Sequence, residues 1–314
     1  LSLILTYLSF YLIKKTMNNK KISMLNKSYF YLISIIFVFL TIFLSVKTSG
    51  FSNRIDNKTL AKVKSFDDYE KINSECRGKI FNNICEHGDL NNLNTILWGD
   101  SHANQLVPVL KKVADQKNFG FYEYSSMGCP PIRNIERLNK ASQDCAKKTD
   151  FIYQKIAEDP KIKNVIIHAY WSYYFNKDHT YTRNDSSINT EMEAGLLEIA
   201  KNNKKIFLIL GIPEMNIDPR KYYVRSNLLD KNNLKNDDRT RLSLNSHKTK
   251  NYQFLKAIEN IKNENIHIFD PASVLCNKLD CYSIQDNKIL YRDNSHISKK
   301  NSYVLYNDLY NFLT

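Results

Sequence analysis

The sequence lacks the patterns that are typical of a zinc site. Its six cysteines include no Cys-x-x-Cys pair, and no cluster of histidines accompanies them. Structural zinc sites usually draw on such pairs, so we expect no metal. Six cysteines allow 15 pairings, but their spacing favours three local disulfides, Cys76–Cys85, Cys129–Cys145 and Cys276–Cys281. Disulfides form in oxidising compartments, which indicates that this part of the chain lies outside the cytoplasm.

The sequence also lacks a basic helix and any motif of nucleic-acid binding. The formal net charge is +13, with 45 Lys and Arg against 32 Asp and Glu. Such a balance often indicates nucleic acid as a partner, but the lysines here are dispersed along the chain. We therefore expect no nucleic acid. A surface of solvated lysines, or attraction to anionic polysaccharide or lipid head groups, explains the charge.

The N-terminal residues lack the features of a signal peptide. Residues 1–13 are apolar but too short to span a bilayer, and no small-residue cleavage site follows them. We interpret them as the remnant of a transmembrane helix, and the basic residues 14–27 as a cytoplasmic loop. Residues 28–46 carry no charge and would extend about 28 Å as a helix. We predict that they cross the membrane, with a buried core helix as the alternative.

The rest of the chain is predicted to be a tether, residues 47–75, and an α/β domain, residues 76–314. Strand-like apolar runs occupy residues 95–98, 120–124, 164–169, 205–210 and 266–269. Amphipathic stretches at 104–116, 142–158, 188–203, 247–263 and 299–312 alternate with them. This alternation predicts a three-layer α/β/α sandwich around a central parallel sheet. Residues 211–246 show no clear period, which favours a lid or a surface loop.

Two short motifs at opposite ends of this pattern carry the chemistry. Ser101, in Trp98-Gly99-Asp100-Ser101-His102-Ala103, follows a strand-like run and precedes a predicted helix. His296 follows Asp293 by three residues. A serine can act as a nucleophile when a histidine takes its proton and an aspartate orients that histidine. The elbow Gly-x-Ser-x-Gly of the α/β-hydrolases is absent. The alternative for Gly99-Asp100-Ser101 is an ordinary turn, and the alternative for Asp293 and His296 is a helix cap.

These motifs resemble the SGNH (GDSL-like) hydrolase superfamily. More narrowly, the chain looks like the extracytoplasmic SGNH domain that is fused behind membrane acyltransferases of the acyltransferase-3 family. The matching residues are Gly99-Asp100-Ser101-His102, Gly128-Cys129-Pro130-Pro131, Asp293-Asn294-Ser295-His296-Ile297-Ser298, and the pair Cys276 and Cys281. The resemblance implies a flavodoxin-like sheet, catalysis by Ser101, His296 and Asp293, and an oxyanion hole formed by the backbone N–H groups of Ser101 and Gly128.

Several further roles are less specific. A turn glycine is the alternative for Gly128. The asparagine that gives the family its third oxyanion donor is missing, because the corresponding place reads His168-Ala169-Tyr170-Trp171-Ser172. Trp171 and Ser172 are candidates for the substrate pocket, with core packing as the alternative for Trp171. His102 is expected to pack or to contact substrate, and Ser298 to cap the last helix.

The resemblance implies an O-acetyltransferase that moves an acetyl group through acetyl-Ser101 onto a hydroxyl of a cell-surface polysaccharide, such as lipopolysaccharide O-antigen. Acetyl-CoA would be the ultimate donor, through an acyltransferase-3 membrane part that this chain lacks, and the soluble domain would need no cofactor. The chain would sit in the plasma membrane with its catalytic domain in the periplasm or outside the cell. A membrane-anchored carbohydrate acetylesterase of the SGNH type and a non-catalytic glycan-binding module are the alternatives.

Overall fold

The computed structural model describes residues 24–48, 85–137, 144–176, 180–182, 187–228, 238–285 and 288–313, and a few single residues before 60. The chain divides into two units, residues 1–60 and 61–314. The first unit contains helix α2 (Met24–Lys47), and the apolar side chains of α2 that the structure describes are exposed. Among the described residues, no helix meets the length and hydropathy of a membrane span. The predicted tether lies almost entirely outside the described residues.

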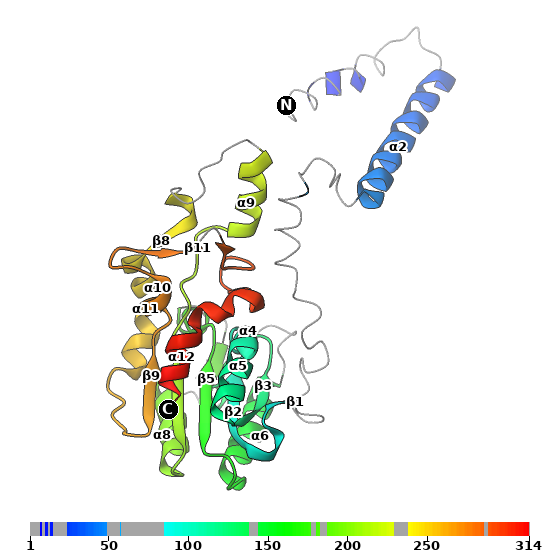
Figure 1. The fold of residues 1–314 in the computed structure, drawn as a ribbon. Helices are drawn as coiled ribbons and strands as arrows, with labels where there is room; N and C mark the ends of the chain where they lie inside the picture. The colour runs from blue at the N-terminus through cyan, green and yellow to red at the C-terminus, as the bar shows by residue number, and fades with distance from the viewer. Residues whose placement is uncertain are drawn as a thin grey trace. The chain divides into compact units, whose positions relative to one another are not determined.

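The second unit is built on a six-stranded sheet in the order β1-β3-β2-β5-β7-β9 (Figure 1). The strands are β1 (Cys85–Gly88), β2 (Leu93–Gly99), β3 (Gly120–Ser125), β5 (Asn164–His168), β7 (Lys205–Ile209) and β9 (Ile266–Phe269). All pair in parallel except β1, which is antiparallel to β3 at the edge. The five predicted strands are confirmed, and their order is the flavodoxin-like one. Strand β1 is an addition that the sequence pattern did not reveal.

Helices cover both faces of the sheet, which confirms the predicted α/β fold. Those that pack on the sheet are α5 (Val107–Lys117), α6 (Cys145–Glu158), α8 (Ile188–Lys201), α10 (Leu244–Ile258) and α12 (Tyr306–Phe312). Successive residues of β5 face opposite ways. Val165 and Ile167 pack in the core with α6, α8 and α10, whereas Ile166 packs in the second core with α5 and α12. A strand buried on both faces needs an apolar residue at every position, which explains the continuous apolar run.

The remaining elements lie in the connections between these strands and helices. They are α4 (Ser101–Gln105), α7 (Trp171–Phe175), α9 (Pro219–Leu228), α11 (Ala272–Leu275), η2 (Leu90–Asn92), η5 (Asp238–Thr240), η6 (Lys299–Leu305), β4 (Ile135–Arg137), β6 (Thr180–Thr182), β8 (Arg241–Ser243), β10 (Asp280–Tyr282), β11 (Ile284–Gln285) and β12 (Lys288–Ile289). The segment 211–246 therefore contains α9, η5 and β8, and β8 pairs with β10. Residues 229–237 of this segment lie outside the described residues.

Two predicted helices are divided in the structure. The helix expected over residues 104–116 is two helices, α4 and α5, which meet at Leu106. Pro108 lies in the first turn of α5. A proline lacks the N–H that would continue a helix and is favoured where a new one begins. The last predicted helix starts as the 3₁₀ helix η6 before it becomes α12.

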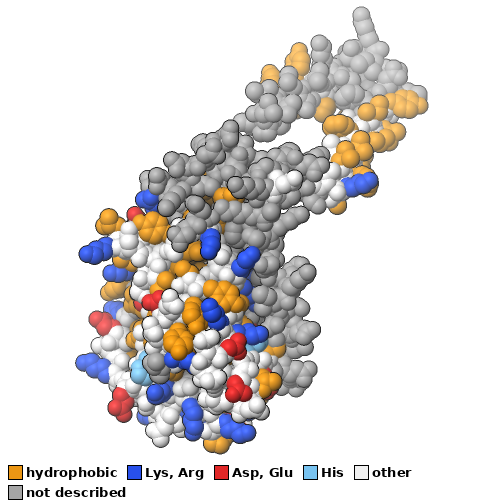
Figure 2. Space-filling view, in the orientation of Figure 1, with side chains coloured by type: hydrophobic (Ala, Val, Ile, Leu, Met, Phe, Trp, Pro, Cys, Tyr) orange, Lys and Arg blue, Asp and Glu red, His pale blue; other side chains and the backbone are white. Residues whose placement is uncertain are grey.

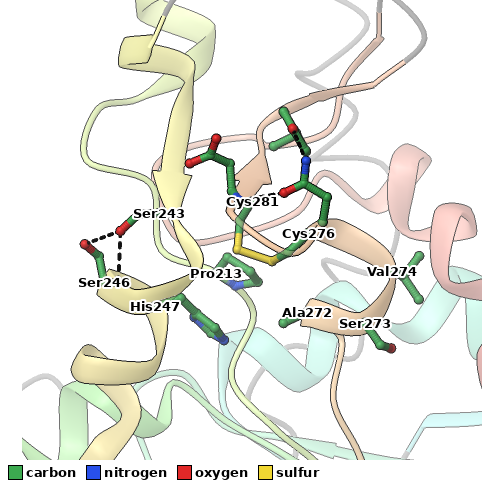
Figure 3. The surroundings of a disulfide bond; sticks show 12 residues. Pro213, Ser243, Ser246, His247, Ala272, Ser273, Val274, Cys276 and Cys281 are labelled. Carbon is green, nitrogen blue, oxygen red and sulfur yellow. Dashed lines mark hydrogen bonds between the residues drawn. A yellow bond between two sulfur atoms is a disulfide. The ribbon is translucent and has the colours of Figure 1, made fainter.

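Two of the predicted disulfides are confirmed, Cys129–Cys145 and Cys276–Cys281. Cys85 is also disulfide-bonded, and Cys76 lies outside the described residues. Figure 3 shows the Cys276–Cys281 bond between the end of α11 and β10, with Pro213 and His247 in its surroundings. The lysines and arginines on the visible face lie singly among other side chains (Figure 2). That view agrees with dispersed, solvated basic residues.

We expect the Cys129–Cys145 disulfide to stabilise the folded domain more than the Cys276–Cys281 disulfide does. The ends of the Cys129–Cys145 loop are 16 residues apart, against 5 for Cys276–Cys281. In the chain-entropy description, loops of these lengths stabilise by about 3 and about 2 kcal/mol. We expect the free energy of unfolding, measured with urea, to fall about 1 kcal/mol further in Cys129→Ala/Cys145→Ala than in Cys276→Ala/Cys281→Ala. Equal losses in the two double variants would contradict this expectation.

Candidate active site

Ser101 is presented by a tight junction between β2 and α4. A Cβ atom on Gly99, the last residue of β2, would lie 1.8 Å from the carbonyl oxygen of His168 and 2.8 Å from Cβ of Ala103. Only glycine allows the strand, its neighbour β5 and the helix to approach so closely. The following residue, Asp100, caps α4, and its carboxylate accepts the backbone N–H of His102 at 2.7 Å. Ser101 therefore lies at the carboxyl edge of the sheet.

Asp100 also ties this junction to the next strand connection. Its side chain is 1% exposed and accepts hydrogen bonds from the backbone N–H of Tyr170 at 3.1 Å and from the hydroxyl of Tyr174 at 2.7 Å. Burial raises the pKa of Asp100, while these hydrogen bonds oppose that shift. The carboxyl group thus joins the segments after β2 and β5, which are the two sides of the point where the strand order reverses. Ligands bind at such points in open α/β sheets.

The structure brings together three of the predicted site residues from opposite ends of the domain. Ser101 Oγ lies 2.8 Å from Nε2 of His296, which is 195 residues away in sequence. Nδ1 of His296 lies 3.0 Å from Oδ2 and 3.1 Å from Oδ1 of Asp293. Because a carboxylate only accepts, Nδ1 carries the hydrogen and Nε2 is left to accept the proton of Ser101.

Asp293 is held in its charged form. Burial would raise its pKa, but hydrogen bonds from His296 and from the backbone N–H groups of Ser295 and His296 hold it well below its usual range. The loop around it is fixed by backbone bonds from Arg292 to His296 and from Ser298 to Leu290. Ser298 caps η6 as predicted, through its bond with the Asn301 N–H.

A cluster of neutral rings lies on one side of the His296 imidazole. The ring of His102 lies 4.2 Å from that of His296 and stacks on Tyr170 at 4.5 Å. His102 is 1% exposed, and its ring nitrogens have no hydrogen-bond partner within the described part of the chain. Burial lowers the pKa of His102 well below its usual value and that of His168 to about 4. Both are therefore neutral near pH 7. The packing role predicted for His102 fits this placement.

A small hollow beside Ser101 is lined by side chains that the sequence did not single out. They are Asn104, Gln105, Ser125, Met127, Arg292 and Lys299. Asn104 and Gln105 lie one turn after Ser101, so helical spacing was an available signal. Arg292 pairs with Asp293 at 3.2 Å. The only signal for Arg292 in the sequence was its position next to Asp293. The hollow thus has two cationic side chains, Arg292 and Lys299, in its lining.

A buried carboxylate orients Asn104. Glu123 accepts hydrogen bonds from the side chains of Asn104 and Ser125 and lies 2.8 Å from Nε2 of His87 on the edge strand β1. Burial would raise the pKa of Glu123, but these partners lower it. No sequence pattern indicated this network, because its members come from β1, β3 and α4.

The remaining predicted residues have mixed outcomes. Trp171 has no exposed surface, stacks on Phe254 at 4.4 Å and donates its indole N–H to Ile209. It is a core residue, as the alternative for it required, and it does not line a substrate pocket. Ser172 is 8% exposed in α7, outside the lining of the hollow. Gly128 has φ +67° in a turn, as its alternative required, and its role in an oxyanion hole stays a prediction.

The family follows from sequence comparison. Residues 70–308 match the family described as "SGNH domain (fused to AT3 domains)". The chain belongs to this family. A solved structure, the periplasmic domain of a lipopolysaccharide acetyltransferase from Salmonella ser. Paratyphi A, superposes with a TM-score of 0.54 at 17% identity. The match covers 70% of this chain and 83% of that one, and it shows a shared fold.

A second structure is a salicylyl-acyltransferase, SsfX3, from a tetracycline biosynthetic pathway. Its TM-score is 0.36 at 11% identity, and the match covers 71% of this chain and 54% of that one. This likeness is too low to support an argument. No curated protein sequence matches the chain.

Because His168 is buried in its neutral form, we expect the free energy of unfolding to fall in mild acid. The pKa of His168 is about 4 in the folded state and about 6.5 when unfolded. Between these values the unfolded chain binds the extra proton, so stability falls as pH falls, by up to about 1.4 kcal/mol per pH unit. His168→Asn keeps a donor for the carbonyl of Ile209. We expect urea unfolding between pH 6.5 and 4.5 to show a smaller pH slope in this variant. The same slope in both proteins would contradict the assignment.

Proposed function

We propose that this domain is an O-acetyltransferase that uses Ser101 as a transient acetyl carrier. The observation that carries the proposal is the alignment of Ser101 Oγ, His296 and Asp293 within hydrogen-bond distance. Membership of a family whose members are fused to AT3 domains supports acyl transfer as the reaction class. The fold shared with a periplasmic lipopolysaccharide acetyltransferase domain agrees with it.

In the first half-reaction, Ser101 Oγ attacks the carbonyl carbon of an acetyl donor. His296 Nε2 takes the hydroxyl proton as the new C–O bond forms. The backbone N–H groups of Ser101 and Gly128 hold the oxyanion of the tetrahedral intermediate. The bond to the leaving group then breaks, and His296 returns the proton to it. Asp293 stabilises the imidazolium in between, and the neutral ring of His102 adds no competing charge.

In the second half-reaction, a sugar hydroxyl attacks the carbonyl carbon of acetyl-Ser101 while His296 takes its proton. The bond from that carbon to Ser101 Oγ then breaks, and His296 returns the proton to Oγ, which releases the acetylated sugar. The acceptor is a hydroxyl of a cell-surface polysaccharide, such as lipopolysaccharide O-antigen. The acetyl group comes ultimately from acetyl-CoA through an acyltransferase-3 membrane part, and residues 28–46 anchor the domain to the plasma membrane. The disulfides Cys129–Cys145 and Cys276–Cys281 support placement of the domain in the periplasm or outside the cell.

The acetyl-serine predicts a defined mass change. We expect the purified chain incubated with p-nitrophenyl acetate to gain one acetyl group, about 42 Da, by intact-mass spectrometry. Ser101→Ala should gain none. Addition of a neutral oligosaccharide should remove the adduct faster than water does and yield acetylated sugar. Acetate release at a rate independent of the sugar would instead identify an esterase, and an equal adduct on Ser101→Ala would overturn the nucleophile.

The role of Asp293 predicts a large rate effect. An asparagine there is neutral, and its NH2 group can donate to Nδ1 of His296, which favours the wrong tautomer of the imidazole and removes the charge that stabilises the imidazolium. We expect Asp293→Asn to slow acetylation of Ser101 by about 10³- to 10⁴-fold. Asp308→Asn, an exposed change on α12, serves as the control and should stay within about twofold of the parent. A loss of less than about tenfold in Asp293→Asn would remove Asp293 from the mechanism.

A further inference from the structure

A second and larger hollow opens on the carboxyl edge of the same sheet. Its volume is about 600 Å³, within the range of sites that hold small molecules. Gly211, two residues after β7, and Asp270, directly after β9, lie in its wall. Helix α10 provides most of the remaining lining, and Asn176 at the end of α7 completes it. We call it the α10 groove.

The lining of the α10 groove is mixed in polarity and balanced in charge. Leu210, Leu255 and the ring of Tyr252 give it apolar surface, amide side chains and hydroxyls lie among them, and Lys248 is the cation and Asp270 the carboxylate among the described residues that line it. Burial lowers the pKa of His247, so this side chain adds no charge near pH 7. Tyr252 is 56% exposed and offers an aromatic ring at the groove. Amides, hydroxyls and an aromatic face without excess charge suit a neutral sugar.

One wall residue has an unsatisfied acceptor. Asn251 is 6% exposed, and its Nδ2 donates to the carbonyl of His247 at 3.0 Å. Its Oδ1 has no hydrogen-bond partner within the described residues. A Cβ atom on Gly211 would lie 2.5 Å from that oxygen, so the side chain of Asn251 packs tightly against the glycine and forms a fixed part of the groove wall.

The α10 groove is coupled to the catalytic loop by a short segment. Gly211 precedes Met215 by four residues, which limits their separation to about 14 Å. The backbone N–H of Met215 donates to the carbonyl of Asn294, next to Asp293, at 2.7 Å. The hydroxyl of Tyr291 donates to the carbonyl of Pro213 at 2.8 Å. One glycan chain of several sugar units can therefore reach from the groove to Ser101.

We infer that the α10 groove binds a neutral sugar unit of the acceptor polysaccharide, several units away from the hydroxyl that receives the acetyl group. This inference rests on the proposed function for its choice of ligand. The groove would hold the polymer by Tyr252 and the amide side chains and so favour long acceptors over single sugars. Binding energy gained there would position the chain without touching the reacting atoms.

The test measures binding without an acyl donor, so that it does not depend on catalysis. The probes are neutral gluco-, galacto- and manno-hexaoses, titrated into the purified full chain by calorimetry. We expect at least one hexaose to bind, and Tyr252→Ala to weaken it about tenfold, which corresponds to about 1.4 kcal/mol for a lost ring contact. Tyr252→Phe should bind within about twofold of the parent because it keeps the ring. Tyr303→Ala, an exposed tyrosine on η6, is the matched control and should bind like the parent.

Three results would overturn the inference. They are no binding of any neutral hexaose, equal affinity in Tyr252→Ala and the parent, and tighter binding of hexagalacturonate than of the neutral hexaoses. A failure of acetyl transfer with Tyr252-dependent binding intact would reject the proposed function but keep the groove as a sugar site. Normal acetyl transfer together with hexaose binding that does not depend on Tyr252 would keep the proposed function and reject the groove as a sugar site.

Discussion

The close approach of β2, β5 and α4 at Gly99 is the constraint on which the site depends. It places Ser101 directly at the end of a buried strand, where backbone and side chain are both fixed. The buried carboxyl group of Asp100 then joins this turn to the segment after β5 through Tyr170 and Tyr174. A buried carboxyl group is stable only with such partners, so the turn and its neighbours must form together.

The electrostatics of the site follow from burial. Three histidines lie within one ring cluster, but His102 and His168 are kept neutral by desolvation. His296 differs because Asp293 stands behind it and stabilises a positive charge on the ring. The histidine that is paired with a carboxylate is thus the one that faces Ser101. The neutral neighbours contribute shape and a low-dielectric wall, which strengthens the interaction between His296 and Asp293.

The sequence predicted the sheet well because its strands are buried on both faces. Continuous apolar runs such as Val165-Ile166-Ile167 have few other interpretations between amphipathic segments. Edge strand β1 was missed because it is only partly buried and carries polar residues. The split between α4 and α5 was missed because the apolar period continues across Leu106.

Sequence alone determined the strand pattern, two of the disulfides seen here, and the identity of the serine, histidine and aspartate that now lie together. These signals are local, because each depends on residue type and short spacing. Only the tertiary structure decided which side chains surround them. Trp171 belongs to the core because Phe254 covers it, and Glu123 orients Asn104 because β1, β3 and α4 meet. The α10 groove likewise arises where the ends of β7 and β9 meet α10. Contacts of this kind join residues far apart in sequence, and no local pattern records them.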